Sequence, residues 1–351
     1  MTVHLRDAMA ALPSYVPGKK IPGAIVLSSN ESPYGLLPSV AGVLADHANG
    51  VSRYPDMGST RLVEAIAAHH GVDTDRVAVG AGSVEVCGQL AGASVDTGDD
   101  VVFGWRAFEA YPIITAVAGG SSVKVPLTSD HVHDVDAMAA AVTDRTRLVF
   151  LCNPNNPTGT VVGEAELSRL VDAVPDRVLV VIDEAYREYV DPGAVPDASV
   201  LFADRANVAV TRTFSKAFAL AGLRVGYCLA APDVVSAVRK CQVPFSVSAL
   251  AQEAAIAALG ETEEVARRAK LTVAERERVR GALLDAGYDV PPSQGNFVWL
   301  VLGERTASFA QACLDGGVIV RPFAGEGVRV TIGADTENDR FLSLAAEFAS
   351  A

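Results

Sequence analysis

Short apolar runs, rich in β-branched residues, alternate with segments of helical periodicity along the first two thirds of the chain. The runs that indicate strands are residues 77–79, 101–103, 123–125, 148–152, 178–182, 208–210 and 225–229. One intervening segment carries the apolar stripe of a helix, at Leu167, Leu170, Val171 and Val174. Nearly continuous apolar strands between helices are typical of a mostly parallel sheet that is covered on both faces. The pattern therefore predicts an α/β domain around a mostly parallel seven-stranded sheet.

The pattern changes after Pro244. Helices are expected from about Ser248 to Leu259 and from about Glu263 to Ala286, the second of them long and charged. Short strands are expected at residues 296–302, 318–321 and 328–332, with a hairpin turn at 325–327. These elements predict a smaller α+β domain.

Chain length and the positions of prolines and glycines suggest the domain organisation. At 351 residues the chain is too long for one simple core. The first 35 residues contain many prolines and glycines, which indicate an extended arm. We therefore expect an N-terminal arm at 1–35 that joins the small domain, a large domain at 36–244 and a small C-terminal domain at 245–351.

Composition and charge exclude several classes of protein. Half of the residues are apolar and 20% are charged, so the chain can form an extensive core. A net charge of −13 argues against a surface that binds nucleic acid, which needs clustered Lys and Arg. No apolar run approaches the length of a membrane span, and the five scattered cysteines lack a CxxC pair, as expected of free thiols in a reducing cytosol. We expect a cytoplasmic protein that binds neither nucleic acid nor a membrane.

The most specific chemical signal lies in residues 213–226, one αβ unit after Asp183. Lys216 leaves an apolar strand among hydroxyl side chains, and Arg224 follows eight residues later. A desolvated lysine has a lowered pKa and can act as a nucleophile and a base. Pyridoxal 5'-phosphate (PLP) requires a lysine for its aldehyde, a carboxylate for its pyridine nitrogen, and hydroxyls with a guanidinium for its phosphate. The order of these residues along the chain predicts a PLP site.

Loops at the carboxyl ends of other predicted strands supply further candidates. The Gly-rich turn at 80–85 can hold a phosphate at a helix N-terminus, although its glycine spacing does not match the dinucleotide pattern GxGxxG. Phe108 can stack on a planar cofactor ring, whereas Tyr111 is better explained by core packing. Asn156, in a loop with two prolines, and Tyr186 can both reach the phenolic oxygen of the cofactor.

Ordinary structural roles also exist for the main candidates. Asp183 can cap the following helix, Lys216 can be a solvated residue at a helix start, and Arg224 can form a surface ion pair. A carboxylate at the end of an aliphatic strand is costly unless it is paired, however. The combination therefore favours the cofactor site.

The residues named above, together with segments 15–19, 29–35, 53–56 and 295–297, resemble one family from nearly end to end. The chain resembles the fold-type I PLP-dependent aminotransferases, in particular the histidinol-phosphate aminotransferase group and the actinobacterial aromatic amino acid aminotransferases. The resemblance implies a homodimer with active sites at the subunit interface, in which Tyr54 reaches the cofactor phosphate of the other subunit. It also implies a phosphate cup formed by Gly82, Ser83, Val84, Thr213, Ser215 and Arg224.

The same resemblance assigns the remaining roles. Lys216, Asp183 and Tyr186 are the catalytic residues that it implies, and Phe108 stacks on the pyridine ring where a tyrosine is common in the histidinol-phosphate enzymes. The residues implied to bind substrate are Arg329 for the α-carboxylate, Arg321 for the side-chain pocket, Asn30 and Tyr15. A bidentate guanidinium–carboxylate pair explains the need for arginine, although a strand-edge ion pair explains both arginines equally well without the family.

The expected reaction is transamination between aromatic amino acids (Phe, Tyr or Trp) and 2-oxoglutarate. The segments 105–112 and 243–248 resemble the aromatic branch of the group. The alternative is histidinol-phosphate aminotransferase, because Arg321 and Tyr15 also suit a phosphate.

Three further classes of protein are disfavoured. A PLP-binding transcriptional regulator needs a basic DNA-binding module, which this acidic chain has no spare length to contain. A PLP lyase or decarboxylase shares the lysine and the aspartate, and product analysis separates it from a transaminase. A metal hydrolase is disfavoured because His131 and His133 have only Asp130 and Asp134 nearby, so we expect no metal and a solvated loop there.

Overall fold

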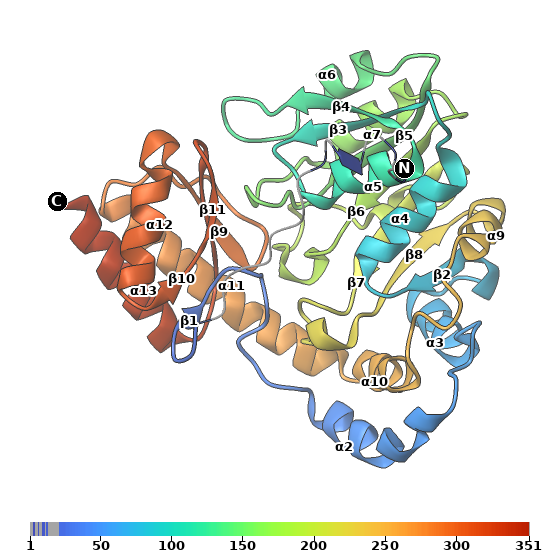
Figure 1. Ribbon diagram of the computed structural model, residues 1–351, viewed down its shortest axis with the longest axis horizontal. Coiled ribbons are helices and arrows are strands. Elements are labelled where there is room, and N and C mark those ends of the chain that lie inside the picture. The colour runs from blue at the N-terminus through green and yellow to red at the C-terminus, as the bar shows by residue number, and fades with distance from the viewer. Residues whose placement is uncertain (1–2, 4–5, 7–8, 11, 13–20, 351) are drawn as a thin grey trace.

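A central sheet forms the larger part of the molecule. The structure, a computed structural model, describes residues 3, 6, 9, 10, 12 and 21–350. Within this part of the chain, the main sheet consists of seven strands: β2 (Val77–Gly80), β3 (Asp100–Trp105), β4 (Ser121–Pro126), β5 (Thr146–Cys152), β6 (Leu179–Asp183), β7 (Val208–Thr213) and β8 (Gly226–Ala230). Their order is β2-β8-β7-β6-β5-β3-β4 (Figure 1). The predicted α/β class and the mostly parallel seven-stranded sheet are confirmed.

Strand β8 is the exception to the parallel arrangement, since it runs antiparallel to both β7 and β2. A parallel connection needs a crossover of a dozen or more residues, usually a helix. Residues 214–225 contain only the short 3-10 turn η4 (Ala221–Leu223) and no α-helix. The chain therefore returns directly beside β7, and this return loop contains Lys216 and Arg224.

Helices cover both faces of the sheet. One face packs against α4 (Ser83–Ser94), α5 (Ala110–Ala118) and α9 (Pro232–Lys240). The other face packs against α3 (Thr60–His70), α6 (Val135–Ala140), α7 (Glu164–Ala173), α8 (Ala198–Leu201) and α10 (Ala249–Leu259). The remaining elements of this part are α2 (Pro38–His47), η1 (Ala48–Ser52), η2 (Thr74–Arg76) and η3 (Arg187–Tyr189). Buried apolar residues alternate between the two faces along the strands, as a doubly covered sheet requires.

A second, smaller unit lies beside the sheet (Figure 1). Its antiparallel sheet has the order β11-β12-β9. Its elements are α11 (Thr262–Asp285), β9 (Phe297–Val301), η5 (Gly303–Arg305), α12 (Thr306–Asp315), β10 (Val318–Ile319), β11 (Arg321–Phe323), β12 (Gly327–Thr331) and α13 (Asp335–Ala349). The strand β1 (Ile25–Val26) of the N-terminal segment pairs in parallel with β10. The single strand expected at 318–321 is therefore wrong, because its first half pairs with β1 and its second half belongs to the β11–β12 hairpin.

The two helices that follow residue 245 belong to different cores. Ala251, Ala254 and Ala255 of α10 pack in the same apolar cluster as α2 and α3. Helix α11 spans both units: Val265 packs in that cluster, whereas Leu283 packs in the core of the smaller unit. We therefore propose that the boundary between the domains lies within α11, about 30 residues after the predicted one.

Candidate active site

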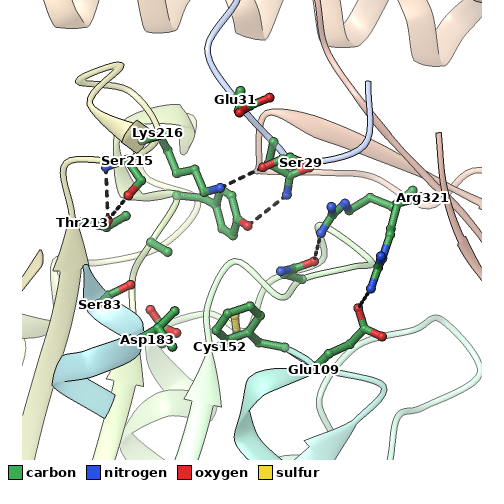
Figure 2. Close-up of a pocket in the computed structure, with 18 of the residues that line it drawn as sticks. Ser29, Glu31, Ser83, Glu109, Cys152, Asp183, Thr213, Ser215, Lys216 and Arg321 are labelled. Carbon is green, nitrogen blue, oxygen red and sulfur yellow. Dashed lines mark hydrogen bonds and ion pairs between the residues drawn. The ribbon is translucent and has the colours of Figure 1, made fainter. Parts of the chain in front are cut away.

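A cavity opens at the carboxyl ends of β5, β6 and β7, between the main sheet and the smaller unit (Figure 2). The large unit contributes the side chains that surround its floor, and β11, β12 and residues 28–31 form the opposite wall. The lining residues from the sequence prediction are Asn30, Ser83, Val84, Phe108, Asn156, Asp183, Tyr186, Thr213, Ser215, Lys216, Arg224, Arg321 and Arg329. Segments far apart in the sequence therefore meet at this cavity.

Lys216 lies in the loop between β7 and β8, and its Nζ donates a hydrogen bond to the carbonyl oxygen of Ser29 at 3.1 Å. The pKa of this amine is lowered to about 7, chiefly by burial and also by the nearby Arg329 guanidinium, whereas Glu31 acts in the opposite direction. A substantial fraction of the amine is thus neutral at neutral pH. This lysine is not the solvated helix-start residue that we considered, and it can act as a nucleophile and a base.

Asp183 is the last residue of β6 and is buried at the floor of the cavity. Its two carboxylate oxygens accept hydrogen bonds from Tyr111 Oη at 2.8 Å and from Thr211 Oγ1 at 3.0 Å. Burial raises the pKa of the Asp183 carboxyl, and the two hydroxyl donors act in the opposite direction. A cation placed against Asp183 would favour its ionised form. The carboxylate is therefore suited to an ion pair with a protonated ring nitrogen.

Tyr111 is a residue whose function the sequence did not reveal. Its ring is fully buried and stacks on Phe150 at a centroid distance of 4.5 Å, so the expected core packing is present. The same side chain nevertheless binds Asp183 through its hydroxyl. Its position three residues after Phe108 was the available signal, since the two rings contact each other edge to face at a centroid distance of 5.6 Å.

A phosphate-sized cradle lies where α4 begins. Gly82 precedes the helix with φ +80°, and a Cβ atom there would collide with the Arg224 guanidinium. Arg224 Nη1 donates to Ser215 Oγ at 3.2 Å, and Thr213 Oγ1 donates to the same oxygen at 3.0 Å. A helix N-terminus, hydroxyls and a guanidinium are the groups that bind a phosphate. The residues present therefore fit the phosphate of PLP.

The opposite wall of the cavity contains a linked set of polar side chains. Asn30 Nδ2 donates to Tyr186 Oη at 2.9 Å, so this hydroxyl is already hydrogen-bonded to a residue predicted to bind substrate. Arg329 Nη1 donates to Asn156 Oδ1 at 2.6 Å, and its Nη2 donates to the Ser28 carbonyl oxygen at 2.5 Å. These bonds hold the buried guanidinium at the cavity wall. Asn156 and Tyr186 both line the cavity, as their predicted contact with one cofactor oxygen requires.

Arg321 also lines the cavity, but it forms an ion pair there. Its Nη2 lies 2.7 Å from Glu109 Oε2, and Figure 2 shows the two side chains pointing toward one another. The ion pair that we considered for this arginine from the sequence is therefore present, and its partner is Glu109. Glu109 was not among the predicted site residues, because an acidic residue at a helix start has a common explanation in the helix dipole.

Two predicted residues lie away from this cavity or outside the described part of the chain. The Tyr54 side chain is 83% exposed and stacks on Phe245 at a centroid distance of 4.6 Å. This exposure is compatible with a role in another subunit, which stays a prediction. Tyr15 lies outside the described residues.

The His131–His133 segment differs from its prediction as a solvated loop. His133 is buried, and its Nε2 lies 3.0 Å from the Cys152 carbonyl oxygen, so this residue packs against the end of β5. Across the residues that the structure describes, no group of three or more His, Cys, Asp or Glu side chains is arranged to hold a metal ion. In the same described part, no helix has both the length and the apolar character that a membrane span requires.

Comparison with known proteins identifies the family. Residues 22–344 match the sequence profile of "Aminotransferase class I and II". The chain belongs to this family. The aminotransferase is 54% identical to a Rhodococcus jostii protein named aromatic amino acid aminotransferase, with 98% of this chain and 96% of that protein covered. A Thermobifida fusca protein of the same name is also 54% identical, with 97% and 96% covered.

Solved structures agree with the fold of this aminotransferase. The histidinol-phosphate aminotransferase of Sinorhizobium meliloti, solved in complex with pyridoxal 5'-phosphate, superposes with a TM-score of 0.91 at 30% identity. The alignment covers 100% of this chain and 98% of that one. The predictions of a fold-type I aminotransferase, and of an enzyme that acts on small amino and oxo acids, are confirmed.

Proposed function

We propose that this aminotransferase uses PLP to transfer amino groups between aromatic amino acids and 2-oxoglutarate. The reaction on aromatic substrates is supported by relatives of that name at 54% identity over nearly the whole chain. The observation that most supports this chemistry is the Lys216 amine. It has a pKa of about 7 and lies in the same cavity as Asp183 and the phosphate cradle.

The residues that would hold the cofactor come from the large unit. Ser83, Thr213, Ser215 and Arg224 would bind its phosphate, and Asp183 would pair with its pyridine nitrogen. When bound, PLP supplies an aldehyde for the substrate amino group and a ring that delocalises the electrons of the broken Cα–H bond. Phe108 at the cavity wall offers a face for that ring.

Lys216 would move the proton in this reaction. With its pKa near 7, the amine can accept a proton from the substrate Cα and return it to a second carbon at comparable cost, since general catalysis is most efficient when the pKa lies near the working pH. Asp183 would stay ionised and keep the ring nitrogen protonated, helped by the hydroxyl donors Tyr111 and Thr211.

Arg329 would bind the substrate α-carboxylate. Its guanidinium is buried and held by Asn156 and the Ser28 carbonyl, so it is preorganised for an anion in the cavity. Both candidate reactions use 2-oxoglutarate, which contains an α-carboxylate, so this arginine suits either of them. The relatives named aromatic amino acid aminotransferase are what favour aromatic substrates over histidinol phosphate.

The test compares two pairs of substrates on the purified holoenzyme. We expect kcat/KM for phenylpyruvate with glutamate to exceed that for histidinol phosphate with 2-oxoglutarate by at least about a hundredfold. A preference for histidinol phosphate would contradict the proposed substrate class. Formation of amines or pyruvate in place of 2-oxo acids would contradict transamination itself.

The homodimer is part of the same proposal. Support comes from Tyr54, which is exposed and lies apart from the cavity of its own chain. If Tyr54 completes the site of the partner subunit, mixing Tyr54→Ala and Lys216→Ala chains should restore activity, because a mixed dimer contains one intact site. No recovery after verified subunit exchange would contradict the shared site. A cytoplasmic location remains a prediction.

A further inference from the structure

Two arginines stand directly opposite each other on the small-domain sheet. Arg321 of β11 and Arg329 of β12 are register partners, and both line the cavity. Like charges at opposed positions of an antiparallel pair destabilise the sheet. Each arginine therefore benefits from groups that accept its hydrogen bonds or offset its charge.

The two arginines have different contacts in the described part of the chain. Arg329 donates hydrogen bonds to the Asn156 side chain and to the Ser28 carbonyl oxygen. Arg321 instead contacts the negative Glu109 across 2.7 Å, from the start of α5 on the large unit. The ion pair connects the two units across the cavity, and its side chains are 16% and 33% exposed.

We propose that Glu109 is a specificity-determining residue that acts as an exchangeable counter-ion for Arg321. The inference rests on the proposed function. A substrate with an uncharged aromatic side chain leaves the ion pair intact, so the far end of the cavity carries no net charge from this pair. A substrate with a distal carboxylate competes with Glu109 for the Arg321 guanidinium, and Glu109 turns to solvent when it is displaced.

Glu109 thus supplies discrimination by charge. In its presence, the distal carboxylate of 2-oxoglutarate and a phosphate dianion both compete with, and are repelled by, an anion that is already in place, and the repulsion is larger for the dianion. An apolar ring meets neither effect. Glu109 would therefore favour aromatic substrates over anionic ones.

The test uses Glu109→Gln, which keeps the shape of the side chain and removes its charge. Competitive inhibition constants are measured for two unreactive acids, glutarate as the dicarboxylate and 3-phenylpropionate as the aromatic acid. We expect the ratio of these constants to shift about tenfold in favour of glutarate, because glutarate no longer displaces an anion. An unchanged ratio, or a shift toward 3-phenylpropionate, would overturn the proposal.

Glu326→Gln is the matched control. Glu326 forms an ion pair with Arg106, whose guanidinium lies 5.5 Å from the Phe323 ring, and Arg321 lies 5.9 Å from the same ring. The substitution removes the same charge nearby but at a residue that does not line the cavity. It should leave the ratio of inhibition constants within about twofold of the wild-type value. If the ratio of inhibition constants shifted equally in both variants, loss of any nearby negative charge would explain the effect, and the proposal would be overturned.

A double variant tests whether Glu109 acts through Arg321. In an Arg321→Gln background, adding Glu109→Gln should no longer improve glutarate binding, since there is no guanidinium left to compete for. A persistent tenfold improvement would show that Glu109 repels anions independently of Arg321. Failure of the proposed function looks different: the wild-type enzyme itself would then prefer histidinol phosphate, whatever the variants do.

Discussion

The hydroxyl of Tyr111 offers a sharp test of how the site stabilises charge. In Tyr111→Phe the ring still stacks on Phe150, so the change is confined to the hydrogen bond of 2.8 Å to Asp183. A hydrogen bond to a charged group contributes about 1.5–3 kcal/mol, and Asp183 is buried where water cannot replace the donor. The variant should therefore favour the neutral acid and weaken the ion pair with the cofactor ring.

We expect kcat for phenylalanine transamination to fall by roughly ten- to a hundredfold, which corresponds to that loss of free energy. The absorbance of the bound cofactor should also change its pH dependence, which a purely structural defect would not alter. Tyr288→Phe is the matched control, because its hydroxyl donates to the buried Ala345 carbonyl at 2.7 Å in the core of the smaller unit. The reasoning is refuted if Tyr111→Phe and Tyr288→Phe show the same kcat and the same cofactor spectra.

Four further predictions concern the cofactor and the carboxylate sites. Lys216→Ala should lose at least about a thousandfold in turnover, and near-normal rates would exclude it as the proton carrier. Apoenzyme should react with PLP faster as pH rises through about 7, where the Lys216 amine becomes neutral. The rate is measured by stopped-flow absorbance, and a rate that increases only near the pKa of free lysine would contradict the lowered pKa. Gly82→Ala should weaken PLP binding at least about tenfold, because the added Cβ collides with Arg224; wild-type affinity in equilibrium dialysis would show that the cradle adjusts. Arg329→Lys should raise KM for phenylalanine more than it lowers kcat, since lysine cannot bind a carboxylate in a bidentate way, and an unchanged KM would remove Arg329 from that role.

The sequence predicted the sheet well because its strands are buried on both faces. A strand such as Val178–Ile182 is recognisable from composition alone, whichever neighbours it acquires. The direction of β8 was not predictable in this way, since an apolar run reads equally well in either direction. The split at 318–321 was missed because two successive short pairings leave no break in the apolar pattern.

The sequence predicted those site residues whose side chains are unusual at their positions in the chain. Asp183 ends a buried strand and Lys216 follows one by three residues, and both stand out because charged groups are rare at such positions. Tyr111 and Glu109 were not identified, since an aromatic residue in an apolar helix and an acid at a helix start are common for other reasons. His133 was misjudged for the opposite reason: polar neighbours suggested solvent, whereas the end of β5 buries its ring.

Arg321 and Arg329 are cross-strand neighbours, so any movement of the small sheet relative to the large one would move both residues together. Such a movement would change their distance from Lys216 but not the distance between their Cα atoms. If the two arginines bind the two carboxylates of 2-oxoglutarate as proposed, the backbone of the sheet would set the distance between those binding groups. Diacids of other lengths would then depend on rotations of the two arginine side chains.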